Sequence, residues 1–484
     1  MEKSSVNSNT FFNTLKSVFS VLYPLITFPY ISRVLQTDNI GKINFGNSIV
    51  SYVSLVASLG VTTYAIRECA KVKENKEELS VVASQILSIN IISTIIAYSV
   101  LVIVLIFAKP LENYRLLICI QSTTVLFATI GAEWINTAME DFKFIAIRTV
   151  LMQVVSLLLM FIFVHKPEDY LKYAVISVLA SSGANITNIF YRRRYLRMRF
   201  IKKMDVKKHL PGILILFSLI LSQTIYVNSD MTILGLIKGD HEVGLYSTAV
   251  KIYQIVNVTI ASIAWVVMPK LTALFEKNDY SEINKLVKYA LNFILVLGIP
   301  SICGLEIIAP HLIVLAAGEE YIDAAPALRT LGMAMACSFI GGWIGNMTFI
   351  PAGKEKICLR VSIVSACINI ILNLILIPRW GLYAAALTTF ISELFGMICG
   401  FIFIDKRIKI DGLFNILSGP VVGGVGIVAI GWAIQHTLEM CWMVVAVTVV
   451  ISIVWYLAVL YITKNEFFLS FARPIIVKIR RREY

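Results

Sequence analysis

The chain is organised as long apolar runs separated by short polar or charged hinges. A helix needs about 20 residues to cross a bilayer, and about 14 runs of suitable length follow one another. Hydrophobic residues make up 58% of the 484 residues, whereas soluble domains are roughly 45–50% apolar. Because backbone groups in a bilayer must be hydrogen-bonded within their own segment, the sequence predicts an all-α membrane protein with about 14 transmembrane helices.

The net charge is +13, and the basic residues cluster in some hinges and are sparse in others. The basic segments are 67–76, 192–208, 270–288 and 464–482. Cytoplasmic loops carry an excess of Lys and Arg, so these segments are expected in the cytoplasm, and an even number of spans places both termini there. This explains the charge without nucleic acid as a partner. Segment 192–208 could also bind anionic headgroups or a diphosphate, although orienting the chain is explanation enough.

A weak internal repeat divides the chain. The hinge glycine Gly41 has a counterpart in Gly244, 203 residues later, and Pro110 has one in Pro310, 200 residues later. Six spans separate the copies, so the two halves are expected to be parallel six-helix lobes. The predicted divisions are an N-terminal lobe (1–191), a basic cytoplasmic linker (192–209), a C-terminal lobe (210–404), two further transmembrane helices (405–463) and a basic cytoplasmic tail (464–484).

Residues that could carry chemistry are sparse outside the apolar runs. The eight cysteines are scattered without a CxxC pair, which predicts neither a metal site nor a disulfide framework. No phosphate-binding Walker A motif is present. The longest predicted extracytoplasmic loop offers an enzyme only His311, Glu319, Glu320 and Asp323. We therefore expect a protein that is not an enzyme and needs no cofactor.

Five stretches resemble one family and span nearly the whole chain. They are FPYISRVL (28–35), YAIRECAK (64–71), GAEWINTAMEDFKFIAIR (131–148), SDMTILGLIKGDHEVGLYSTAVKI (229–252) and GEEYIDAAPALRTLG (318–332). They resemble the Wzx-like oligosaccharide flippases, the polysaccharide biosynthesis members of the multidrug/oligosaccharidyl-lipid/polysaccharide (MOP) exporter superfamily. That superfamily also holds MurJ-like lipid II flippases and MATE drug exporters. One departure is that Leu35 is followed by Gln36, where the family's hinge looks like Leu-Gly.

The resemblance implies a MATE/MurJ-like fold in a bacterial cytoplasmic membrane. It implies a flippase that moves undecaprenyl-pyrophosphate-linked oligosaccharides from the inner to the outer leaflet by alternating access, for capsule, O-antigen or exopolysaccharide assembly. The implied partners are that lipid-linked oligosaccharide, membrane lipids and, in some systems, a polysaccharide polymerase and assembly proteins. Coupling to an H⁺ or Na⁺ gradient stays open.

Two other function classes remain as alternatives. A MATE-like, cation-coupled exporter of small amphipathic molecules would prefer an anionic cavity, which two candidate cavity cations argue against. A membrane glycosyl polymerase or ligase acting on the same lipid carrier would need positioned acids and bases at the outer surface, and the loops provide few.

Ionisable residues inside predicted spans are the candidate substrate-binding groups. Each costs about 2.5–3.5 kcal/mol on insertion scales unless it is paired, hydrated or at the interface. We expect Arg33 and Lys251 to attract the diphosphate in the cavity between the lobes, and Asp230 to pair with Lys251 until the anion replaces it. MurJ-like relatives resemble this in carrying cavity cations on spans one and eight. Alternatively, Lys251 and Asp230 form a structural ion pair and Arg33 reaches the interface.

Glu393 falls near the middle of the predicted twelfth span, without a charged neighbour in sequence. A desolvated carboxylate suits ion coupling. A protonated glutamate that hydrogen-bonds between two helices is an equally good explanation.

Opposite charges gather at the predicted cytoplasmic ends of spans two, four and five. They are Arg67, Glu68, Glu133, Glu140, Asp141 and Arg148. We interpret them mainly as a structural network that keeps the first lobe rigid, with a cytoplasmic gate as the alternative.

Overall fold

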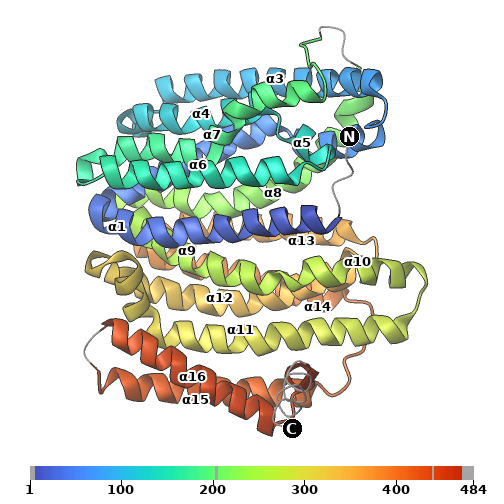
Figure 1. Cartoon of the computed structure of the whole chain (residues 1–484). Coiled ribbons are helices and arrows are strands. Elements are labelled where there is room, and N and C mark those ends of the chain that lie inside the picture. Colours follow the sequence, from blue (N-terminus) through green and yellow to red (C-terminus); the bar gives the residue numbers. More distant parts are fainter. Residues whose placement is uncertain (1–5, 202–204, 439–440, 471–484) are drawn as a thin grey trace, which may run out of the picture. The chain divides into compact units, whose positions relative to one another are not determined.

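The computed structural model describes residues 6–201, 205–438 and 441–470, and every regular element in these ranges is helical. The contacts divide the chain into two compact units, Met1–Gly244 and Leu245–Tyr484. Figure 1 shows the long helices of each unit running side by side. The predicted all-helical membrane fold is confirmed.

The first unit begins with a long helix that is broken once. Its elements are α1 (Val6–Ser58), α2 (Val61–Lys71), α3 (Lys76–Phe107), η1 (Lys109–Tyr114), α4 (Arg115–Gly131), α5 (Trp134–Ala138), α6 (Phe142–Phe163), η2 (Pro167–Asp169), α7 (Tyr170–Tyr191), η3 (Arg192–Arg194) and α8 (Val206–Lys238). Helix α8 packs against α1, so by contacts it belongs to the first unit. The lobe boundaries drawn from the repeat stay a prediction.

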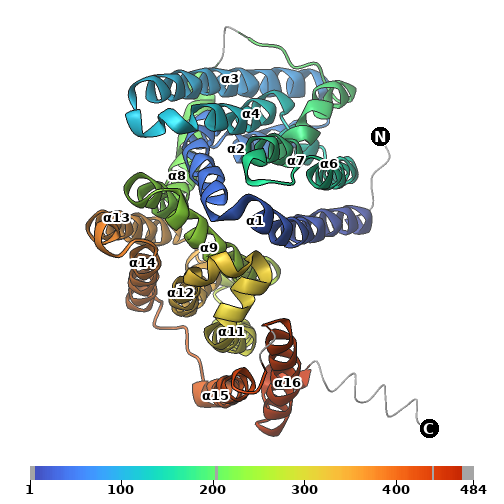
Figure 2. The ribbon, with the colours of Figure 1, turned by 90° about the vertical axis from the view of Figure 1, so that its left-hand side faces the viewer.

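From α10 to α14, the second unit resembles the order of helices from α2 to α7 and has two further long helices after it. Its elements are α9 (Asp240–Ala261, which begins in the first unit), α10 (Ile263–Glu276), α11 (Tyr280–Ala317), η4 (Glu319–Ala324), α12 (Ala325–Ile344), the π-helical turn η5 (Gly345–Phe349), α13 (Glu355–Trp380), α14 (Leu382–Phe403), α15 (Leu413–Gln435) and α16 (Cys441–Ile462). Figure 2 shows α13 beside α14 and α15 beside α16, and both pairs are in contact.

The described residues contain eleven helices that are long and apolar enough to cross a membrane, or up to thirteen if each of two bent helix pairs counts as one span. The predicted number of fourteen is therefore not confirmed. The helical stretch Phe11–Lys71 counts once although its 61 residues are enough for two spans. Large apolar side chains on outer faces, such as Ile103 and Phe107 of α3, are exposed, as expected for helices that face lipid.

The repeated order of elements corrects one of the two sequence markers of the repeat. The 3₁₀ turn η1 after α3 corresponds by its place in the order to η4 after α11. Pro110 lies at the start of η1, whereas Pro310 lies inside α11, which continues to Ala317. The expectation that Pro110 and Pro310 are equivalent is therefore wrong, because the apolar run of α11 extends past the predicted hinge.

The other marker coincides with two helix breaks that contact each other. Gln36 breaks α1 with φ 65° and ψ 173°, and Gly239, 203 residues later, ends α8 with φ 89° and ψ −172°. This backbone conformation is available essentially only to glycine, so Gln36 is strained where the family's pattern has glycine. Gln36 stands where glycine was expected, and α1 is nevertheless broken at this residue.

The contact between the breaks is reciprocal, and we call residues 36–41 with 239–244 the hinge crossing. A Cβ atom on Gly41 would lie 1.8 Å from the carbonyl oxygen of Asp240, and one on Gly244 would lie 2.2 Å from that of Thr37. Such distances are prohibitive, so both positions require glycine. The imidazole Nδ1 of His241 lies 3.1 Å from the carboxylate of Asp38 at the exposed rim.

Candidate functional site

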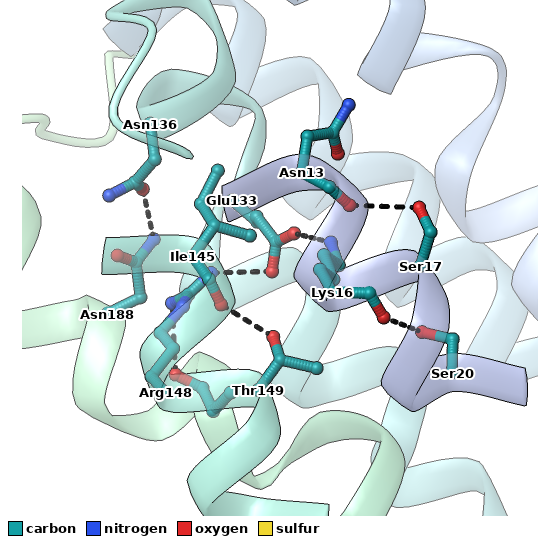
Figure 3. A network of polar contacts seen from close by, with 11 residues as sticks. Asn13, Lys16, Ser17, Ser20, Glu133, Asn136, Ile145, Arg148, Thr149 and Asn188 are labelled. Atoms are coloured by element: carbon teal, nitrogen blue, oxygen red, sulfur yellow. Dashed lines mark hydrogen bonds and ion pairs between the residues drawn. The ribbon is translucent and has the colours of Figure 1, made fainter. Parts of the chain in front are cut away.

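A buried polar network lies at one end of the first unit, and we call it the Glu133 hub (Figure 3). The chain forms it locally because Ala132, with φ 48° and ψ 51°, ends α4 in a left-handed conformation and turns Glu133 toward α6. Lys16 of α1 and Arg148 of α6 both reach the Glu133 carboxylate. Three separate segments therefore meet at one side chain.

The two ion pairs of the hub differ in burial. Arg148 Nη2 lies 2.5 Å from Glu133 Oε2, and the arginine side chain is only 5% exposed. A second donor, Arg148 Nη1, reaches the carbonyl oxygen of Ala184 on α7 at 3.0 Å. Lys16 Nζ lies 3.2 Å from Glu133 Oε1, and both of these side chains are 33% exposed. The Arg148 bond is thus part of the packed unit, whereas the Lys16 bond lies at its edge.

Amide groups extend the hub beneath the ion pairs. Asn188 Nδ2 of α7 donates to the carbonyl oxygen of Gly131 at 2.8 Å and to Asn136 Oδ1 at 2.7 Å. Both asparagine side chains are fully buried. This arrangement ties the end of α4 and the short helix α5 to α7, and so holds Glu133 in place.

Asp141 organises the neighbouring surface. Its carboxylate caps α6 by accepting from the Phe144 backbone N–H at 3.2 Å, and it accepts from the Tyr191 hydroxyl at 2.8 Å and from the Tyr195 hydroxyl. Burial and this carboxylate raise the pKa of Tyr195 far above its ordinary value, so the phenol stays a hydrogen-bond donor. Tyr191 also stacks on Phe144 at 3.4 Å between ring centroids.

The opposite charges that were predicted to form one network at the cytoplasmic ends of spans two, four and five form three separate groups in the structure. Glu133, Asp141 and Arg148 lie together, whereas Arg67 and Glu68 pair within α2, where Lys71 also reaches Glu68 at 2.9 Å. Glu140 forms a third, exposed group with Lys73 at 2.8 Å. Sequence reasoning did not identify Lys16, because it lies 117 residues from Glu133 in the chain.

The four candidate cavity residues belong to different units. Arg33 and Asp230 lie in the first unit, on α1 and α8, and Lys251 and Glu393 lie in the second, on α9 and α14. The Arg33 guanidinium is exposed and donates to the carbonyl oxygen of Pro29 at 2.6 Å, one helical turn earlier. Asp230 is buried. The pairing of Asp230 with Lys251 stays a prediction.

Each unit also contains a group of hydrogen-bonded neutral polar side chains. In the first unit, two residues after Asp230, Thr232 Oγ1 donates to Ser48 Oγ at 2.9 Å and lies 3.2 Å from the Tyr52 hydroxyl.

In the second unit, Asn257 Nδ2 donates to the Tyr253 hydroxyl at 3.1 Å and to Ser338 Oγ at 3.4 Å. Helices α9 and α12 thereby contribute to one polar cluster. Sequence reasoning did not identify these neutral residues, because Ser, Thr and Asn are also common in ordinary helix packing. Among the described residues, no three His, Cys, Asp or Glu side chains are arranged to hold a metal ion.

Together, the repeated order of spanning helices and the charged and polar groups within them define a multi-pass membrane protein of the transporter class. The solved structure of the lipid II flippase MurJ in an inward closed conformation resembles it with a TM-score of 0.73 at 18% identity, covering 96% of this chain and 100% of that one. An inward-facing MATE multidrug transporter of the MOP superfamily gives 0.63 at 17% identity, covering 82% and 97%.

The family described as "Polysaccharide biosynthesis protein" matches residues 6–275, and the chain belongs to that family. A protein named as an O-antigen transporter of Shigella dysenteriae is 23% identical over 392 residues, 80% of this chain and 96% of that protein. The capsular polysaccharide biosynthesis protein CapF of Staphylococcus aureus is 26% identical over 399 residues, 81% and 97%. The expected membership of a polysaccharide biosynthesis family is therefore confirmed, and so is the expected MATE/MurJ-like fold.

Proposed function

We propose that this protein flips polyprenyl-diphosphate-linked oligosaccharides from the inner to the outer leaflet of the cytoplasmic membrane, for assembly of a surface polysaccharide. The observation that carries the proposal is the near full-length match to both an O-antigen transporter and a capsular polysaccharide protein, on a fold shared with a lipid II flippase. Their names refer to O-antigen, capsular polysaccharide and lipid II, and we propose that the substrate of this chain is likewise a glycan on a lipid carrier. Membrane lipids are the second partner, and a polymerase is a further candidate.

The substrate head group carries two phosphates, and Arg33 and Lys251 are the groups proposed to attract it. Arg33 supports this role because its guanidinium is exposed rather than enclosed by packing, so a phosphate oxygen can reach it. Asp230 would pair with Lys251 between transport events. The hydrogen-bonded neutral Ser, Thr, Tyr and Asn side chains of the two units would bind sugar hydroxyls, which both donate and accept hydrogen bonds.

The Glu133 hub is proposed to act as a structural core with one releasable edge. Arg148 is held by Glu133 and by the Ala184 carbonyl group, and losing it would leave the partly buried Glu133 carboxylate without its arginine partner. Lys16 is bound only at the edge, where an ion pair contributes about 0–1 kcal/mol. Release of Lys16 would therefore let the first half of α1 move while the rest of the hub stays intact.

Energy coupling is proposed to pass through Glu393. The Glu393 carboxylate lies on the spanning helix α14, where it could exchange a proton or bind Na⁺ together with neutral oxygen ligands. Glu393→Gln should then abolish the dependence of transport on the ion gradient while leaving the protein folded. Retention of full pH and Na⁺ dependence in that variant would remove Glu393 from the coupling mechanism.

The orientation is proposed from the basic segments, which place both termini in the cytoplasm. Cysteine labelling from outside the cell tests this placement, and a single reporter cysteine in the tail should stay unlabelled. Labelling of the tail from outside would reverse the assignment of every loop.

The experiment that tests the function is translocation of a polyprenyl-diphosphate oligosaccharide in proteoliposomes, measured as the fraction of glycan accessible to an external enzyme. The wild type should translocate it, and Arg33→Ala and Lys251→Ala should be slower by tenfold or more, since each removes a cation from the head-group site. Arg360→Ala, an exposed arginine on α13, is the matched control and should transport normally. Full activity in both cavity variants would contradict the assigned site.

A further inference from the structure

The backbone of the basic segment after α7 is held in place by hydrogen bonds to α3. Three serines, spaced four residues apart on one face of α3, form hydrogen bonds with the backbone of this basic segment. Ser80 Oγ donates to the Arg197 carbonyl oxygen at 3.1 Å, the Arg199 N–H donates to Ser84 Oγ at 3.2 Å, and the Ile201 N–H donates to Ser88 Oγ at 2.9 Å. Residues 197–201 are therefore fixed along α3, and Figure 1 shows this stretch beside α3 at the edge of the first unit.

This path presents arginines outward. Tyr195 and Leu196 are buried in the core cluster of the unit, whereas Arg193, Arg194, Arg197 and Arg199 are exposed. We call these four the arginine strip. Among the residues that the structure describes, no carboxylate forms an ion pair with any of the four. The strip thus offers four exposed arginines within seven residues, two of them on a backbone that is held along α3.

The length of α3 gives the depth of the strip in the membrane. Helix α3 has 32 residues, about 48 Å at 1.5 Å per residue, whereas the hydrocarbon core is about 30 Å thick. If its far end, next to η1, lies at one boundary of the core, roughly the first 12 residues project beyond the other. Ser80 and Ser84 lie in that projecting part, and Ser88 lies at its boundary. The strip therefore runs at the level of the phospholipid headgroups.

Orienting the chain requires positive charge but no fixed geometry. Here the backbone is held by three hydrogen bonds, and the exposed aromatic ring of Phe200 lies next to Arg199, as is usual for side chains at the membrane interface. One guanidinium group can bind two oxygens of the same phosphate, so the matching ligand is a phosphate close to the membrane surface. We infer that the arginine strip is a binding surface for the headgroups of anionic phospholipids in the inner leaflet.

The test is lipid binding to the purified full chain in detergent. Native mass spectrometry would count bound phosphatidylglycerol against phosphatidylcholine, and the midpoint of thermal unfolding would report folding. Arg197→Gln/Arg199→Gln should weaken phosphatidylglycerol binding at least tenfold, because each interfacial arginine contributes about fourfold to fivefold. The matched control Lys356→Gln/Arg360→Gln removes two exposed charges from α13 and should bind as the wild type does.

A second variant separates geometry from charge. Ser84→Ala/Ser88→Ala keeps every charge but removes the acceptors for Arg199 and Ile201, and it should weaken binding several-fold. Unchanged binding in this variant, or equal losses in the strip and control variants, would overturn the inference. Soluble pyrophosphate that competes as strongly as phosphatidylglycerol would also overturn it, because the strip would then belong to the substrate head group.

Discussion

The hinge crossing and the Glu133 hub hold the first unit together in opposite ways. At the hinge crossing, backbone meets backbone at Gly41 and Gly244. At the hub, three segments meet through one carboxylate and the charges of Lys16 and Arg148. A contact made by shape tolerates no added atom, whereas a contact made by charge can be released and formed again. We therefore regard the crossing as the permanent joint and the edge of the hub as the contact that changes during transport.

The largest effect is expected at the hinge crossing. Gly41→Ala and Gly244→Ala would each place a methyl group within 2.2 Å of a carbonyl oxygen, so the helices must separate, and we expect losses of about 3 kcal/mol or more. The measurement is the thermal midpoint of the purified protein, with the amount of membrane-inserted protein alongside. Gly304→Ala is the control, since its methyl group would meet nothing within 4 Å and alanine favours the helix. Equal losses in all three variants would show that the close approach is not the cause.

The second effect concerns charge in the hub. Glu133→Gln leaves the buried Arg148 without its carboxylate, and we expect a loss of about 3 kcal/mol, at the lower end for a broken buried pair because Glu133 is partly exposed. Glu133→Gln/Arg148→Met should recover part of that loss, since the unpaired charge is gone. Thermal midpoints of the two variants decide the matter. A double variant less stable than Glu133→Gln alone would mean that Arg148 acts by packing and not by charge.

The third effect compares the two helix breaks directly. Gly239→Ala should cost about 1–2 kcal/mol, because its conformation is strained for alanine while no atom lies within 4 Å of the new methyl group. Gln36→Gly should stabilise the protein by about 1 kcal/mol, because it removes the same strain from α1. The thermal midpoint should therefore fall in Gly239→Ala and rise in Gln36→Gly, although both residues have the same backbone conformation. A loss in Gln36→Gly would indicate that the glutamine side chain has its own stabilising contact.

The smallest effect on stability is expected at Lys16. Lys16→Met removes an ion pair that is one-third exposed and should change the free energy of unfolding by no more than about 1 kcal/mol. Transport rate should nevertheless change, because the first half of α1 loses its bond to the hub. Lys73→Met, which breaks the exposed pair with Glu140, is the control and should leave transport unaltered. If the two lysine variants transport equally well, the hub has no releasable edge.

The sequence predicted the part of this picture that depends on residue type and local pattern. Long apolar runs identify spanning helices, and the Gly41 and Gly244 marker located both helix breaks. Glu133, Asp141 and Arg148 could be grouped because they lie within one short stretch. Lys16 is more than 100 residues from Glu133 in sequence, so only packing reveals their contact. The serines that hold the arginine strip were equally hidden, since Ser80, Ser84 and Ser88 look like ordinary small residues on a helix face.

The most direct test of the account measures two cargoes in the same proteoliposomes, a polyprenyl-diphosphate oligosaccharide and a small cationic dye. The account predicts that the glycan becomes accessible to the external enzyme and that the dye is not transported. Transport of the dye with no translocation of the glycan would contradict the account and indicate a drug exporter.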